Sequence, residues 1–197
     1  MTARARMRMG AWCCGSMALV CAFAGGAGAE ASGEQPAGGR LKGFADREGQ
    51  PAKAELIAEH ASLQPGGKTR VGVSFELEEG WHIYAKEPGD AGLPTKIAWS
   101  GPRLVTFGPL IWPVAQEFNE PGHIKTFGYS GAVVLASDLR LSPQAKAGQA
   151  IHVSAKVEWL SCKEICLPGS AQLELWLPVT EAAPNPSTHG EFFDHTG

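Results

Sequence analysis

The stretch Ile151-His152-Val153-Ser154-Ala155-Lys156-Val157-Glu158-Trp159 decides the fold, because apolar and polar residues alternate along its whole length. Successive side chains of a β-strand point to opposite faces, so the pattern predicts a strand with one face in a core and one in water. Similar or shorter strand patterns are expected at 54–60, 70–77, 82–85, 96–99, 132–136 and 172–177.

Glycine and proline turns separate these segments, and none of the sequence shows a convincing amphipathic helix. About seven to nine short strands within about 130 residues indicate an all-β fold, an antiparallel β-sandwich. The chain has 197 residues, of which 44% are apolar and 19% charged, which suits one domain with a hydrophobic core. Its net charge of -3 argues against a nucleic-acid partner, which normally needs a basic face.

The N-terminus has the features of a secretory signal peptide. Arginines lie within the first eight residues, an apolar run covers 11–24, and Ala27-Gly28-Ala29 form a small-residue cleavage site. About fourteen apolar residues are too few for the roughly 20 that a membrane-spanning helix needs. We therefore expect residues 1–29 to be removed on export to the periplasm, with a lipoprotein start at Cys21 as the alternative.

The remaining chain is expected to have three parts. Residues 30–51 form a flexible lead-in, 52–180 the β-sandwich domain, and 181–197 a flexible tail. Without the leader the protein keeps two cysteines, Cys162 and Cys166, and has no apolar run long enough to enter a membrane. It should therefore work outside the cytoplasm, where disulfides persist, and we expect a monomer.

The two cysteines are the main candidates for chemistry. A disulfide between residues four apart requires a turn between them, so a strand should end near Leu160, and Pro168 should limit the following strand. A structural bridge would add only about 2 kcal/mol for so short a loop, which favours a redox pair. A structural disulfide and a Cu(I) site that recruits His82 or His123 remain alternatives.

A binuclear copper site does not fit the same segment. The spacing of the cysteines resembles the copper loop of cytochrome oxidase subunit II, but Ser170 and Leu173 occupy the positions of its histidine and methionine. A four-ligand zinc site would need more than two cysteines or other visible ligands. We therefore expect no cofactor and assign no metal ligand.

Several motifs, in this order and spacing, resemble the N-terminal periplasmic domain of DsbD-type thiol:disulfide interchange proteins, including the copper-tolerance ScsB group. The resemblance covers roughly residues 52–180. The matching stretches are Gly80-Trp81-His82-Ile83-Tyr84, Gly92-Leu93-Pro94-Thr95, Ile111-Trp112-Pro113, Glu117-Phe118, Phe127-Gly128-Tyr129-Ser130-Gly131 and Cys162 to Pro168.

The resemblance implies an immunoglobulin-like sandwich that carries a redox pair and passes electrons between thioredoxin-like periplasmic proteins, with a membrane electron-transfer protein as a further partner. Cys166 would form the mixed disulfide and Cys162 would resolve it. A cap loop over about 114–127 would cover the pair with Phe118, beside Glu117, and Tyr84 would lie near the sulfurs. If the chain acts as an enzyme, the implied activity is protein-disulfide reductase.

Two departures from the family pattern affect these expectations. Three residues separate the cysteines here, whereas the best-known members have five, so the loop and its fit to partners should differ. The chain is expected to lack the family's membrane and thioredoxin-like domains, so another protein would have to recharge it. We also expect Glu158 and Glu164 to disfavour the thiolates, with Lys163 opposing them.

Overall fold

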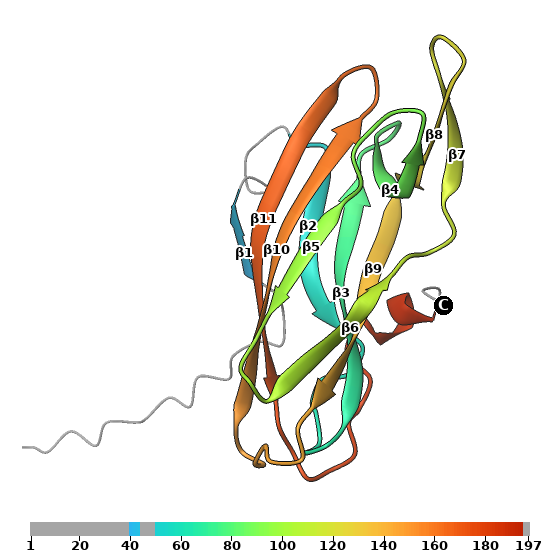
Figure 1. The fold of residues 1–197 in the computed structure, drawn as a ribbon. Helices are drawn as coiled ribbons and strands as arrows, with labels where there is room; N and C mark the ends of the chain where they lie inside the picture. Colours follow the sequence, from blue (N-terminus) through green and yellow to red (C-terminus); the bar gives the residue numbers. More distant parts are fainter. Residues whose placement is uncertain (1–39, 44–49, 195–197) are drawn as a thin grey trace, which may run out of the picture. The chain divides into compact units, whose positions relative to one another are not determined.

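The structure, a computed structural model, describes residues 40–43 and 50–194, with no side chains described for 40–43. The predicted signal peptide lies outside these residues. The described elements are β1 (Arg40–Gly43), β2 (Ala52–Ala58), β3 (Lys68–Leu77), β4 (His82–Gly89), β5 (Lys96–Ser100), β6 (Val105–Ile111), β7 (Gln116–Glu120), β8 (Ile124–Ser130), β9 (Ala132–Leu141), β10 (Ala150–Cys162), β11 (Cys166–Pro178) and the short 3-10 helix η2 (Gly190–Phe193) (Figure 1).

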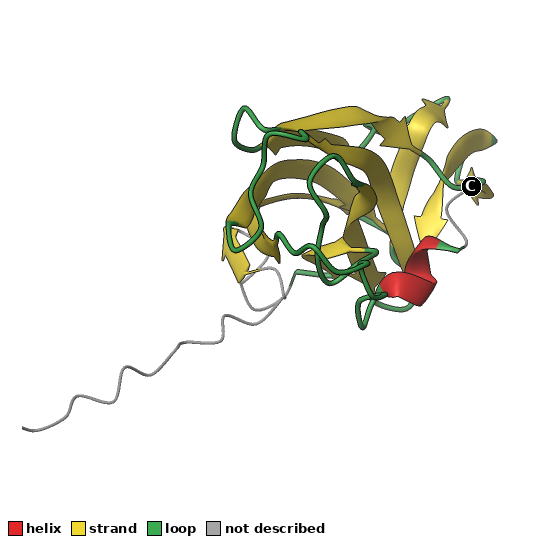
Figure 2. Cartoon of the chain, turned by 90° about the horizontal axis from the view of Figure 1, so that it is seen from below, coloured by secondary structure: helices red, strands yellow, loops and turns green. Residues whose placement is uncertain are grey.

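The strands form two sheets that face each other. One has seven strands in the order β1-β11-β10-β4-β8-β7, with β5 paired to β10, and the other has four in the order β2-β3-β9-β6 (Figures 1 and 2). The pairings between these strands are antiparallel. The predicted all-β, immunoglobulin-like antiparallel β-sandwich is confirmed.

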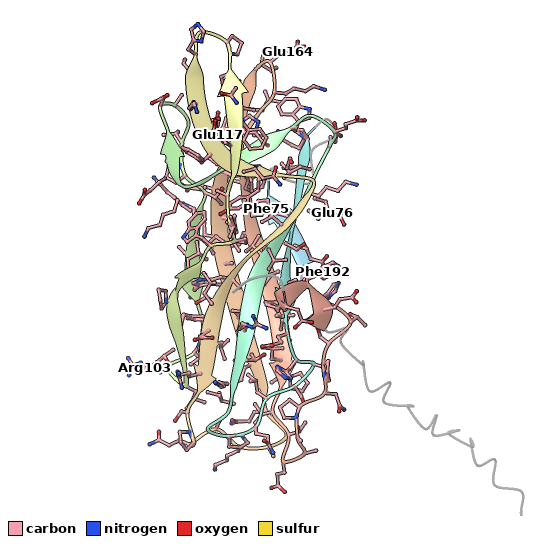
Figure 3. The ribbon with its side chains drawn as sticks, turned by 90° about the vertical axis from the view of Figure 1, so that its right-hand side faces the viewer. Phe75, Glu76, Arg103, Glu117, Glu164 and Phe192 are labelled. Atoms are coloured by element: carbon pink, nitrogen blue, oxygen red, sulfur yellow. A yellow bond between two sulfur atoms is a disulfide. The ribbon has the colours of Figure 1, made fainter. Side chains whose placement is uncertain are left out.

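Residues 151–159 of β10, whose alternation predicted the fold, have their apolar side chains in the core. Every odd-numbered residue from Ile151 to Trp159 is buried, and so are the alternate leucines of β11. The rings of Trp159 and of Phe75 from the opposite sheet meet edge to face at 5.3 Å, and Phe75 is labelled in Figure 3. Even-numbered residues of β10 therefore face outward, and this outer face is the one that carries Cys162.

The segments predicted as lead-in and tail each contain an element of secondary structure. In the lead-in, residues 40–43 form β1, which pairs with 171–174 of β11. In the tail, η2 lies outside the four-stranded sheet, and the ring of Phe193 is fully buried there (Figure 2). The Arg70 guanidinium also donates a hydrogen bond to the Phe193 carbonyl at 2.6 Å.

The tail is anchored because the outer face of the four-stranded sheet carries an apolar patch. Ile57, Val134 and Ala136 form this patch, and burial of a phenylalanine ring on it is strongly favourable. The polar composition after residue 180 predicts a flexible segment, whereas the structure shows a packed contact at Phe193. Phe192 beside it is exposed (Figure 3).

Candidate functional site: a cysteine pair under a β-hairpin

Cys162 and Cys166 form a disulfide at the end of the β10–β11 hairpin. They are the last opposed pair of the ladder, with Cα atoms 4.2 Å apart, and residues 163–165 make the turn. This is close to the roughly 4.5 Å spacing of opposed residues that do not exchange hydrogen bonds. The strands are therefore longer than predicted, because β10 continues past Leu160 to Cys162 itself.

Pro168 lies within β11, opposite Leu160, instead of ending the strand. Hydrogen-bonded and non-hydrogen-bonded pairs alternate along an antiparallel ladder, so the Leu160–Pro168 pair is of the same type as the cysteine pair. The proline nitrogen then faces away from β10 and removes no hydrogen bond from this ladder. The prediction that Pro168 limits the strand is thus wrong.

The two cysteines differ in accessibility. Cys162 is 3% exposed, whereas Cys166 is exposed. The difference follows from the neighbouring strands, since β4 pairs alongside the end of β10, with His82 opposite Cys162. The other neighbour of β11 is β1, which pairs with residues 171–174, several positions beyond Cys166.

His82 lies opposite Cys162 on β4 and is 4% exposed. Its ring stacks on Phe118 with centroids 4.4 Å apart and meets Tyr84 edge to face at 5.1 Å. Its Nε2 has no hydrogen-bond partner among the described residues and lies 3.7 Å from a Glu120 carboxylate oxygen. Burial lowers the pKa of His82, and the Glu120 charge opposes this in part.

The segment predicted as a cap loop is a β-hairpin formed by β7 and β8. Strand β8 pairs with β4, so the hairpin is held beside the strand that covers Cys162. It lies at the same end as the β10–β11 turn (Figure 1), and Figure 3 shows Glu117 and Glu164 at that end. At its base the Tyr129 hydroxyl donates a hydrogen bond to the Pro113 carbonyl at 2.9 Å.

The two predicted cap residues, Phe118 and Glu117, differ in their burial and contacts. Phe118 is half-buried against His82, on the side of the cysteine pair. Glu117, the next residue along β7, is exposed and forms an ion pair with Lys125 at 2.8 Å. This ion pair therefore joins β7 to β8 within the hairpin.

Tyr84 is buried beside His82. Burial, with a smaller contribution from the Glu120 charge, raises the pKa of Tyr84. The backbone of Gly92 packs against the Tyr84 ring. Gly92 has φ +99°, and a Cβ atom at this position would come within 2.3 Å of that ring. This close approach holds the loop of Leu93 and Pro94 beside the sheet.

The charges near the pair are arranged differently from the prediction. Glu158 is four residues from Cys162 along a strand, about 13 Å at a rise of roughly 3.3 Å per residue, which exceeds the screening length of about 8 Å in physiological salt. It is also paired with Lys156 at 2.8 Å, and this hydrogen bond lowers the pKa of Glu158. Lys163 reaches across to the Glu79 carbonyl at 3.1 Å.

His82 and Glu120 are the residues of this site whose positions the sequence alone did not reveal. The signals available for His82 were its place in the Gly80–Tyr84 motif, two residues before Tyr84, and its mention as a possible copper ligand. His123, the other histidine considered for copper, lies in the β7–β8 turn with φ 63°. Among residues 40–43 and 50–194, no group of three or more His, Cys, Asp or Glu side chains is placed to hold a metal ion.

The arrangement suits nucleophilic attack on one sulfur of the disulfide. An incoming thiolate can reach Cys166, while the buried Cys162 becomes the leaving group. Within the described part of the chain, no helix is long and apolar enough to cross a membrane.

One of the comparisons with solved structures supports the same fold. The N-terminal periplasmic domain of ScsB from Proteus mirabilis matches with a TM-score of 0.55 and 18% identity, over 82% of this chain and 60% of that one. A type I cohesin from Pseudobacteroides cellulosolvens matches with a TM-score of 0.34 and 8% identity, over 68% of this chain and 97% of that one. No curated protein matches.

This chain thus spans less than two thirds of the ScsB structure. The family model "Thiol:disulfide interchange protein DsbD, N-terminal" matches residues 52–178, which include both cysteines and the hairpin beside them. The chain belongs to the family of DsbD N-terminal domains.

Proposed function

We propose that Cys162 and Cys166 are a redox pair that exchanges disulfides with thioredoxin-like proteins in the periplasm. This proposal rests on the unequal burial of the two cysteines. Cys162 is 3% exposed, whereas Cys166 is exposed. A purely structural bridge needs neither sulfur accessible. Membership in the DsbD N-terminal family supports the same chemistry.

The exchange has two balanced steps when the pair acts as the reductant. The Cys166 thiolate attacks one sulfur of the partner's disulfide, which forms a mixed disulfide and releases the partner's other thiolate. The Cys162 thiolate then attacks the Cys166 sulfur, closes the internal disulfide and releases the partner's second thiolate. Two electrons pass to the partner, and the two protons lost by the cysteines balance those its thiolates take up. A reduced thioredoxin-like protein recharges the pair by the reverse steps.

The β7–β8 hairpin acts in this proposal as the cap. Phe118 stacks on His82, and His82 opposes Cys162, so the hairpin limits access to the resolving sulfur more than to Cys166. Movement of the hairpin would open the way to Cys162, which is 3% exposed, for the second step. Exposure of Cys166 means that the cap does not have to open for the first contact with a partner.

The location follows from the family and from the leader sequence. The related ScsB domain is periplasmic, and we propose removal of residues 1–29 during export to the same compartment. The mass of the mature protein tests this, because cleavage predicts a chain that begins near Glu30. A chain that keeps its first 29 residues, or that carries lipid on Cys21, contradicts it.

A redox titration of the purified protein tests the exchange itself. An interchange pair should equilibrate with thioredoxin-like proteins and have a midpoint potential within the range of such proteins, about −270 to −120 mV. A structural disulfide should stay oxidised across that range, because its own midpoint potential lies below about −300 mV. The second result would reject the proposed function in favour of a structural bridge.

A further inference from the structure

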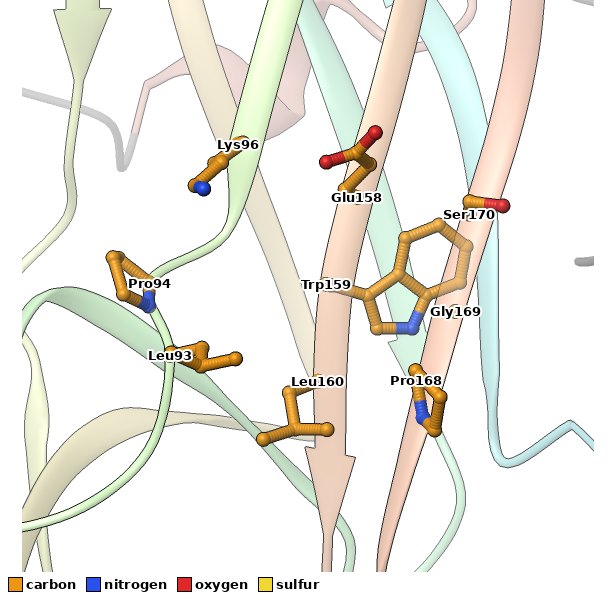
Figure 4. A pocket seen from close by; sticks show the side chains of 9 residues that line it. All are labelled: Leu93, Pro94, Lys96, Glu158, Trp159, Leu160, Pro168, Gly169 and Ser170. Carbon is orange, nitrogen blue, oxygen red and sulfur yellow. The ribbon is translucent and has the colours of Figure 1, made fainter.

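A groove lies on the outer face of the seven-stranded sheet, next to the cysteine pair. Its volume is about 400 Å³. Figure 4 shows its walls, with Leu93 and Pro94 on one side, Leu160 in the middle and Pro168 on the other side. Lys96 and Glu158 lie at one end of it (Figure 4).

The groove and the disulfide share one face of the same two strands. Leu160 and Pro168 form the opposed pair two positions before the cysteines, so their side chains point the same way about 7 Å away. A protein whose disulfide reaches Cys166 must therefore cover at least part of this groove. A small disulfide reagent can reach Cys166 without touching it.

The chemistry of the walls favours an apolar occupant. Leu93 is 63% exposed and lies with Pro94, Leu160 and Pro168 in the lining, so apolar side chains make up most of the walls. The nearest anionic group, Glu158, is already paired with Lys156. The chain's own C-terminal segment packs on the other sheet through Phe193, so it does not supply the occupant as far as the structure describes it.

We propose that the groove is the docking site for an apolar side chain of the thioredoxin-like partner, at the surface next to its exchanging disulfide. This proposal rests on the proposed function and adds a recognition element to it. Apolar contacts in the groove would hold the partner while its sulfur attacks or is attacked by Cys166. Burial of an apolar side chain against these walls removes apolar surface from water, which favours binding.

The test compares a protein disulfide with a small one. Reduced wild-type protein and its Leu93→Asp and Leu93→Lys variants are mixed with oxidised thioredoxin, and separately with 5,5′-dithiobis(2-nitrobenzoic acid). Both substitutions should slow the reaction with thioredoxin by about tenfold, as expected for loss of roughly half of a leucine's burial. The rate with the small reagent should change by less than about twofold, because the reagent does not use the groove.

The matched control is Val114→Asp, which places the same charge at an apolar residue that is 95% exposed and does not line the groove. Circular dichroism and thermal unfolding establish that each variant is folded. Equal thioredoxin rates for the Leu93 and Val114 variants would overturn the docking site. So would opposite effects of Asp and Lys, which would indicate a charge effect.

The same experiment separates this proposal from the proposed function. If wild-type protein reacts with the small reagent but not with thioredoxin, the docking site is overturned and the reactive pair stands. If reduced wild-type protein reacts with neither, the redox function itself fails. A Leu93 variant that is folded and loses both reactions would show disturbance of the pair, which also overturns docking.

Discussion

Substitution of Phe118 by alanine should expose the resolving cysteine. In a Cys166→Ser background Cys162 is the remaining thiol of the pair, and His82, on which Phe118 stacks at 4.4 Å, lies opposite it. Such ring contacts contribute about 0.5–1.5 kcal/mol beyond area burial. Loss of that energy should raise the ratio of molecules with Cys162 uncovered to molecules with Cys162 covered by about 2- to 12-fold. The conversion follows because about 1.4 kcal/mol corresponds to a factor of ten.

The assay is the rate of alkylation of Cys162 by iodoacetamide at neutral pH, followed by mass spectrometry. The matched control is Phe127→Ala, on the neighbouring strand of the same hairpin. Phe127 is paired opposite Glu117, so it faces the other side from Phe118. The Phe118 variant should react faster and the Phe127 variant at the parent rate. Equal rates in all three folded proteins would remove the cap from the mechanism and leave β4 as the cover of Cys162.

Three further predictions concern stability, each measured as the free energy of unfolding in denaturant. The unfolded state binds a proton on His82 near pH 6.5, and burial lowers the pKa of His82 in the folded state despite Glu120. Stability should therefore fall as pH drops below about 6.5, and His82→Phe should flatten this dependence; parallel curves would contradict it. Phe193→Ala should cost about 3 kcal/mol, because the ring is fully buried; a loss below about 1 kcal/mol would show that the segment is not anchored. Gly169→Ala should cost about 1–3 kcal/mol, because the new methyl group would come within 2.2 Å of the Trp159 ring, and an unchanged stability would contradict that contact.

The strands and their inward faces were predictable because side-chain alternation is a local property. Residues 151–159 illustrate this, since each residue expected in the core is buried. Strand ends were less predictable. Pro168 was expected to limit β11, but its effect depends on whether its nitrogen faces the partner strand or the open edge, and this is set by the register of the β10–β11 ladder.

The cysteine pair could be predicted from spacing, whereas its surroundings depend on contacts between distant segments. His82 is 80 residues from Cys162 in the sequence, and the β4–β10 register alone brings them together. Phe118 was expected near the pair through the family resemblance, but its stacking on His82 was not. The packing of Phe193 also depends on distant segments, since the composition of the C-terminal residues does not indicate the apolar patch that this ring covers.

The trapping of a mixed disulfide tests the central claim most directly. The Cys162→Ser variant, reduced and mixed with an oxidised thioredoxin-like protein, should accumulate a covalent complex through the exposed Cys166 on a non-reducing gel, because the resolving thiol is absent. The Cys166→Ser variant should accumulate little, because Cys162 is buried. A complex that forms with the Cys166→Ser variant and not with the Cys162→Ser variant would reverse the two roles and contradict this account.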